Sequence, residues 1–150
     1  MADVAANLYS WSTTASSNSP SDATTIGAGL ADNLQAIQAV VRGDLASKGS
    51  DITSGAAIDP GALVGLFHDV TGTTTCTSMG TVAAGIWKVL KFEGAQLLTH
   101  NATNLILPGG ANIITANGDI GLFVSEGSGN WRCFGYVRAA TDSPGYFGIP

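Results

Sequence analysis

The 150-residue sequence predicts a mainly β protein, in which an extended N-terminal arm and a single amphipathic helix precede a compact antiparallel β-sandwich or barrel. Two observations predict this fold class. Apolar residues first recur at steps of three and four, which is the period of a helix, and short apolar or alternating segments separated by turn residues follow. We divide the chain into an arm over 1–25, a helix over 26–48, a linker over 49–62, a β domain over 63–138 and a tail over 139–150.

The composition excludes several classes of protein. Asp, Glu, Lys and Arg make up 11% of the residues, and the net charge is −5 with only six Lys and Arg. Nucleic-acid binding draws on clustered basic residues, so we expect no nucleic-acid partner. Every apolar stretch is interrupted before the roughly 20 residues that cross a membrane, and the start of the chain lacks a secretory signal. We expect no membrane insertion, synthesis in a cytoplasm and, because charge is scarce, a surface that contacts other subunits.

The arm over 1–25 has no sustained period and is rich in Ser, Thr and Asn, which compete for backbone hydrogen bonds. It carries three large apolar side chains, those of Leu8, Tyr9 and Trp11. Such residues either fold back on their own domain or anchor the chain in another protein, where aromatic side chains dominate the binding energy. The tail over 139–150 leaves the strand pattern and is a second candidate docking segment.

The helix expected over 26–48 has one apolar stripe. Thr24 or Thr25 can cap its start, and Lys48 followed by Gly49 is typical of a helix end. A single stripe packs either on its own domain or on copies of itself around a symmetry axis, and the period alone does not choose between the two. The stripe, a candidate for self-association, consists of Ile26, Leu30, Leu34, Ile37, Val41 and Leu45.

The remaining chain has the regular spacing of short strands and turns that is typical of an all-β domain. Asn117-Gly118 is the strongest candidate for a tight hairpin, and residues 127–130 form another expected turn. Within 86–92, alternate residues point to opposite sides of a strand, and both sides are largely apolar. One of these sides is therefore a candidate for cover by a neighbouring subunit. Strands are expected over 63–67, 73–77, 85–92, 96–99, 105–107, 113–115, 120–125 and 131–137.

The sequence contains no pattern that predicts catalysis or cofactor binding. His68-Asp69 could orient a general base, but no nucleophile motif accompanies it. The two histidines and the aspartates lack the spacing of metal ligands, so we expect no metal and no cofactor. Cys76 and Cys133 are interpreted as small buried hydrophobic residues with reduced thiols, although their spacing leaves a disulfide between them open.

Residues 97–113, followed by 116–119 and 123–133, resemble a β-rich module of tailed-bacteriophage fibre and virion-surface proteins. The resemblance extends over about 71–136, and upstream the segment 11–18 and the expected helix resemble the leader of such proteins. It implies a non-enzymatic structural role in a virion, commonly as a homotrimer. The protein would be made in the host cytoplasm. The resemblance also implies that other phage virion proteins are the partners.

Three functions follow as hypotheses. The first is a short tail fibre or fibre-like tail appendage anchored through the arm, and the second is a capsid decoration (cement) protein, which the short length favours. The third is a host-glycan-binding module, in which Trp87, Trp131 and Tyr136 would stack on sugars; core or interface packing is the other interpretation of these aromatic residues.

Overall fold

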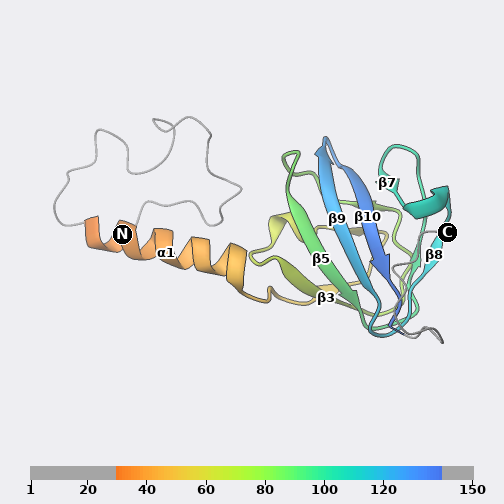
Figure 1. The fold of residues 1–150 in the computed structure, drawn as a ribbon, viewed down its shortest axis with the longest axis horizontal. Helices are drawn as coiled ribbons and strands as arrows, with labels where there is room; N and C mark the ends of the chain where they lie inside the picture. The colour runs from red at the N-terminus through yellow and green to blue at the C-terminus, as the bar shows by residue number, and fades with distance from the viewer. Residues whose placement is uncertain (1–29, 140–150) are drawn as a thin grey trace.

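The computed structural model describes residues 30–139, which form one projecting helix and a β domain (Figure 1). The arm with Leu8, Tyr9 and Trp11, the first helical position Ile26 and the tail after Ala139 lie outside the described residues. The expected mainly β class with a single helix is confirmed for the part that is described. The β domain is a curled six-stranded sheet, a half-barrel, with two small two-stranded sheets.

The helix α1 spans Leu30–Ala46 and ends two residues before the expected end. Lys48 does not cap it; this residue already pairs with Phe67 in an isolated parallel β-bridge. Figure 1 shows α1 pointing away from the β domain, so that only its C-terminal end meets the sheet. Along the apolar stripe, Ile37 and Val41 are half-buried, whereas Leu34 and Leu45 are 52% and 58% exposed.

The strands and short 3-10 turns follow the helix in close succession. They are β1 (Ile52–Thr53), β2 (Ala57–Ile58), η3 (Pro60–Ala62), β3 (Phe67–Thr71), β4 (Ser78–Met79), β5 (Trp87–Phe92), β6 (Leu97–Leu98), β7 (Leu105–Ile106), η4 (Pro108–Gly110), β8 (Ile113–Ile114), β9 (Ile120–Gly127) and β10 (Asn130–Val137). Each of the last six expected strands overlaps an observed one, and β9 and β10 extend beyond the expected bounds. The strands expected over 63–67 and 73–77 are wrong, because the chain turns there and the regular strands β3 and β4 come later. Within 73–77, only Cys76 pairs, in an isolated parallel bridge with Leu98.

The sheet is mixed, so the expectation of a wholly antiparallel domain is wrong. The six strands lie in the order β1-β3-β5-β9-β10-β7, and the pairs β1–β3, β3–β5 and β10–β7 are parallel. Parallel neighbours need a long crossover, and residues 72–86 supply one between β3 and β5. Only β5–β9 and β9–β10 in this sheet are antiparallel. The smaller sheets pair β2 with β4 and β6 with β8.

The expected linker over 49–62 is part of the β domain. Ile52 in β1 and Ile58 in β2 are both buried in the hydrophobic core. The turn signal at residue 59 is confirmed, because the Asp59 carboxylate accepts a 3.2 Å hydrogen bond from the Ala62 N–H and caps η3. The domain therefore starts immediately after the helix.

One expected hairpin is wrong and another is confirmed. Gly118 has a φ of 89° and its segment does turn, but β8 on one side pairs with β6, while β9 on the other pairs with β5 and β10. The true hairpin joins β9 to β10, where Gly127, Ser128 and Gly129 all have positive φ. The same turn chemistry serves a hairpin or a change of sheet, and the partner strands decide which one forms.

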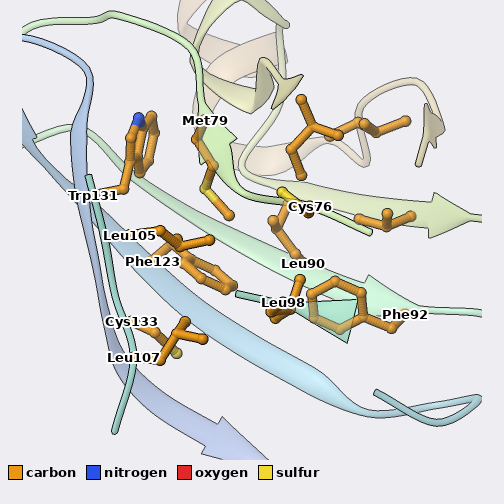
Figure 2. Close-up of a cluster of buried hydrophobic side chains, with 13 residues drawn as sticks. Cys76, Met79, Leu90, Phe92, Leu98, Leu105, Leu107, Phe123, Trp131 and Cys133 are labelled. Carbon is orange, nitrogen blue, oxygen red and sulfur yellow. The ribbon is translucent and has the colours of Figure 1, made fainter. Parts of the chain in front are cut away.

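The core fills the hollow of the curled sheet. Figure 2 shows Leu90, Phe92 and Phe123 pointing from the sheet toward Met79 and Leu98, which come from the small sheets. Trp131 is fully buried, and its indole Nε1–H donates a 2.7 Å hydrogen bond to the carbonyl oxygen of Gly80. The core side chains are those of Ile52, Ile58, Val70, Cys76, Met79, Leu90, Phe92, Leu98, Leu105, Leu107, Phe123, Trp131 and Cys133.

The two cysteines are free and buried, as expected. Each thiol donates to a backbone carbonyl oxygen two residues ahead, from Cys76 to Ser78 and from Cys133 to Gly135. Burial raises the pKa of both thiols, and that of Cys133 reaches about 11. Both thiols therefore stay protonated and unreactive at neutral pH.

Gln96, just before β6, provides a test of the packing. Its side chain is buried, and neither amide atom has a hydrogen-bond partner. Because each unsatisfied buried polar group costs about 1–3 kcal/mol, we expect Gln96→Leu to raise the free energy of unfolding by about 1–2 kcal/mol. Urea unfolding measures this change. Gln38→Leu, at an exposed position of α1, is the control, and a loss of stability in the Gln96 variant would contradict the prediction.

Candidate functional site

The helix is attached to the sheet through a buried polar junction, formed by Asp44, Gly65 and Lys88. Asp44, in the last turn of α1, is fully buried and accepts a 3.3 Å hydrogen bond from the Gly65 N–H. Lys88, on the inner face of β5, is also fully buried, and its ammonium group donates to the carbonyl oxygens of Leu63 (2.7 Å) and Gly65. Gly65 thus binds the helix through its N–H and the sheet through its carbonyl group.

Opposite charges at the junction offset part of the cost of burial. Burial lowers the pKa of Lys88, and the negative charge of Asp44 acts in the other direction. A buried charge that loses its partner is strongly destabilising, typically by about 3–5 kcal/mol. Asp44 and Lys88 therefore depend on each other, although 44 residues separate them in the sequence.

A histidine completes the attachment. The ring of His68 in β3 lies with Nδ1 2.9 Å from the Ser50 carbonyl oxygen and with Nε2 3.0 Å from that of Gly65. Two glycines allow this approach, because a Cβ at residue 49 would collide with His68 Cε1, and Gly65 has a φ of 106°. His68 faces the interior, whereas Asp69 lies on the opposite side of the strand. The two residues consequently do not form the acid–base pair that the sequence suggested.

A second buried polar cluster closes the far end of β10. Asp119 is fully buried, and its carboxylate accepts hydrogen bonds from Tyr136 Oη (2.7 Å), the N–H groups of Ala116 and Ala139 (2.9 Å each) and Arg138 (3.1 Å). Burial alone would raise the pKa of Asp119, but these hydrogen bonds and the charge of Arg138 lower it below 3.8. Burial, together with the hydrogen bond to Asp119, raises the pKa of Tyr136.

The second candidate site is the side of β5, β9 and β10 that points away from the hydrophobic core. We call this side the outer face. Strand register places Trp87 beside Val124 and Val89 beside Leu122, and Phe134 lies in a β-bulge next to this row. Trp87, Phe134 and Val137 are 46%, 55% and 41% exposed. The sequence predicted a largely apolar second face on β5, and in the structure this face continues across β9 and β10.

The charges around the outer face are paired within the chain. The Lys48 ammonium lies 2.8 Å from carboxylate oxygens of both Asp51 and Asp69, and Lys91 lies 3.2 Å from Asp69 and 3.3 Å from Glu93. The hydrogen bond from Lys48 is the largest of the effects that lower the pKa of Asp69. At the other end, Arg132 Nε lies 2.6 Å from Glu126 Oε1. The apolar centre is thus bordered by ion pairs.

The proposed glycan-contact residues do not form a common site. Trp131 is buried in the core, with its indole N–H bound to Gly80, so the expectation that it stacks on sugars is wrong. Tyr136 is half-buried, and its hydroxyl is held by Asp119. Of the three, only Trp87 presents much of its ring to solvent. Trp131 is internal because β10 alternates, with Trp131 and Cys133 inside and Arg132 outside.

No group of three or more metal-ligating side chains occurs among residues 30–139. Within the same residues, α1 is neither long nor apolar enough to cross a membrane. His100 is also engaged in the fold, because its Nδ1 accepts a 3.1 Å hydrogen bond from the Leu107 N–H. The polar side chains of these two clusters and His100 hold loops and strand ends in place.

No protein-family model, no curated protein and no solved structure matches this chain.

The sequence contained signals for part of these sites. Lys88 shares a strand face with Ile86, Leu90 and Phe92, and a lysine on an apolar face indicates a buried charge that needs a partner. Asp44 interrupts the apolar side of the helix, but nothing local identifies Lys88 as its neighbour. Phe134 was missed because the β-bulge between Cys133 and Gly135 breaks the alternation of β10.

The junction predicts a large effect of Lys88→Met. The substitution keeps a long apolar chain but leaves the buried Asp44 carboxylate without the opposing charge, so we expect the free energy of unfolding to fall by about 3–5 kcal/mol. Urea unfolding measures the loss. Lys91→Met, at a partly exposed ion pair, should cost about 1 kcal/mol or less, and Asp44→Leu combined with Lys88→Met should be less harmful than the two separate losses added together. Equal losses for Lys88→Met and Lys91→Met would contradict the role of the junction.

The Asp119 cluster predicts a pH dependence. Since the pKa of Asp119 is lower in the folded chain than its ordinary value of 3.8, its ionisation stabilises the fold above that pH, and the stabilisation disappears as the pH falls through the folded value. We expect Asp119→Asn to cost about 3 kcal/mol at pH 6 and progressively less below pH 3.8. Unfolding curves across this range measure the difference. The exposed Asp51→Asn should be nearly neutral, and a cost for the Asp119 variant that does not change with pH would contradict the prediction.

Proposed function

We propose that this chain is a non-enzymatic structural protein of a bacteriophage particle, a short tail fibre or fibre-like tail appendage that assembles as a homotrimer and is anchored through its N-terminal arm. The observation that carries the proposal is the projecting helix, in which Leu34 and Leu45 of the apolar stripe are exposed. The resemblance of 97–133 to a module of phage fibre and virion-surface proteins supports the place in a virion.

The helix supports self-association for an energetic reason. Most of the stability of a helix in a protein comes from the packing of its apolar face, and α1, with 17 residues, contacts its own β domain only through its last turn. Leu34 and Leu45 are more than half exposed, so the helix leaves unburied the surface that would stabilise it. Burying such a leucine contributes about 1.5–3 kcal/mol, and copies of the same helix provide a matching surface.

The spacing of the stripe supports an assembly of more than two helices. Leu34, Ile37 and Val41 lie three and four residues apart, which makes them a, d and a positions of a heptad repeat. Leu at a followed by Ile at d favours trimers or tetramers over dimers. The next d position is Asp44, which binds Gly65 of its own β domain, and there the helix passes from the proposed helical bundle to the sheet.

A capsid decoration protein is the second candidate, because a compact β domain of about 90 residues without shaft repeats also suits a cap on a capsid surface. Copy number distinguishes the two placements, with tens of chains at most in a tail and hundreds on a capsid. Mass spectrometry of purified particles and density in images of the intact particle provide the count.

Deleting residues 1–21 should abolish incorporation into particles while the β domain stays folded, since the arm carries Leu8, Tyr9 and Trp11.

The glycan-binding module remains a third candidate only through the exposed ring of Trp87. Binding on a glycan array that is lost in Trp87→Ala, with the assembled mass retained, would favour it over the structural role.

Self-association gives a direct prediction. Light scattering of the full chain at micromolar concentration should give about 45 kDa, three times the 15.1 kDa of one chain. The double substitution Leu34→Gln and Leu45→Gln should shift the mass toward 15.1 kDa, because it removes apolar surface from the stripe without removing a helix-forming residue. Gln35→Glu with Gln38→Glu, on the polar side, is the control. A wild-type mass of 15.1 kDa would overturn the homotrimer.

A further inference from the structure

The outer face has the composition of a subunit contact. Its centre is formed by large apolar side chains from three adjacent strands, and it contains two of the exposed aromatic residues of the described chain, Trp87 and Phe134. Aromatic residues are enriched at the centres of protein interfaces, whereas Lys, Asp and Glu are depleted there. The apolar set is Trp87, Val89, Ile120, Leu122, Val124, Phe134 and Val137.

The β-bulge in β10 shapes this face. The register shifts between Cys133 and Gly135, so that Phe134 is an extra residue and Gly135 pairs with Leu122. A Cβ at residue 135 would lie 3.1 Å from Leu122 Cδ1, so the glycine leaves room for the Leu122 side chain. Bulges commonly redirect a side chain. Here the bulge leaves Phe134 55% exposed, although its neighbours Cys133 and Trp131 are buried.

The charges identify the kind of partner. At one edge, the residues Asp51, Lys48, Asp69, Lys91 and Glu93 form a chain of alternating ion pairs, and at the other edge Arg132 pairs with Glu126. Each basic group on these edges is thus already neutralised by carboxylates of its own chain. A nearly neutral rim neither attracts a charged polymer nor repels an identical surface, which suits a second copy of this chain.

We infer that the outer face is the contact between the β domains of neighbouring copies, in addition to the contact between helices. The inference rests on the self-association in the proposed function. Its geometry follows from β5, which carries Lys88 on the inner side, where the helix is attached, and Trp87 and Val89 on the outer side. One strand thus connects the helix junction to the outer face. When the helices associate, the sheets of neighbouring copies are therefore held in fixed positions relative to one another.

The test compares Trp87→Thr and Phe134→Thr with Ile114→Thr. Threonine suits a strand, and Ile114 is a matched control because it is 63% exposed and lies in β8, outside the six-stranded sheet. Each outer-face substitution should raise the dissociation constant between copies about thirtyfold or more, as expected for a central aromatic residue, and the control should change it less than about threefold. Light scattering over a dilution series gives the constants, and circular dichroism with urea unfolding verifies that the variants are folded.

The outcomes separate this inference from the proposed function. If the outer-face variants keep the wild-type dissociation constant while the Leu34/Leu45 double variant dissociates, the inference is overturned and the homotrimer stands. A wild-type chain that is monomeric at all concentrations overturns both. If the control weakens assembly as much as the outer-face variants do, the assignment to this face is wrong.

A second measurement needs no disruptive substitution in the face. In a Trp11→Phe background, acrylamide quenching reports on Trp87, because the only other tryptophan, Trp131, is fully buried. Concentrated, assembled protein should be quenched several times less than protein diluted below the dissociation constant. Quenching that does not change with concentration, while light scattering shows assembly, would overturn the inference.

Discussion

The structure depends on how a helix with little support of its own is fixed to a sheet. Asp44 and Lys88 are buried from opposite sides against one glycine, so that two charges which are costly to bury separately stabilise each other. Gly49 and Gly65 are required because a side chain at either position would collide with the groups that meet there. A purely apolar contact would hold the helix as firmly, but hydrogen bonds to defined backbone groups also fix its direction.

Buried polar groups and exposed apolar groups are separated in this chain. The fully buried charges, Asp44, Lys88 and Asp119, lie at two ends of the sheet, where the helix begins to project and where β10 finishes. Between these ends, the inner face is a closed core and the outer face is apolar without cover from the elements that pack on the inner side. The polar clusters hold the two ends in place, and the apolar outer face is left available for contact.

The strands were predictable where alternation is local, and their partners were not. In β5 the two faces follow directly from the period of two, and in β10 the alternation of Trp131, Arg132 and Cys133 indicates that Trp131 is internal. Parallel pairing of β3 with β5 depends on a crossover of 15 residues, and Lys88, whose charge opposes that of Asp44, is 44 positions away from it. No local sequence pattern predicts either relation. Asn117-Gly118 gave a correct turn and a wrong hairpin for the same reason.

The few charged side chains of the β domain are paired within the fold. Residues 69–138 contain four acidic and four basic side chains, and all of them are engaged in ion pairs, backbone hydrogen bonds or the buried junction. These charges are therefore paired within the chain, and few are left to keep an exposed apolar surface soluble. The chain pairs its charges internally and exposes Leu34, Trp87 and Phe134, and this is the surface that we propose other copies of the chain cover.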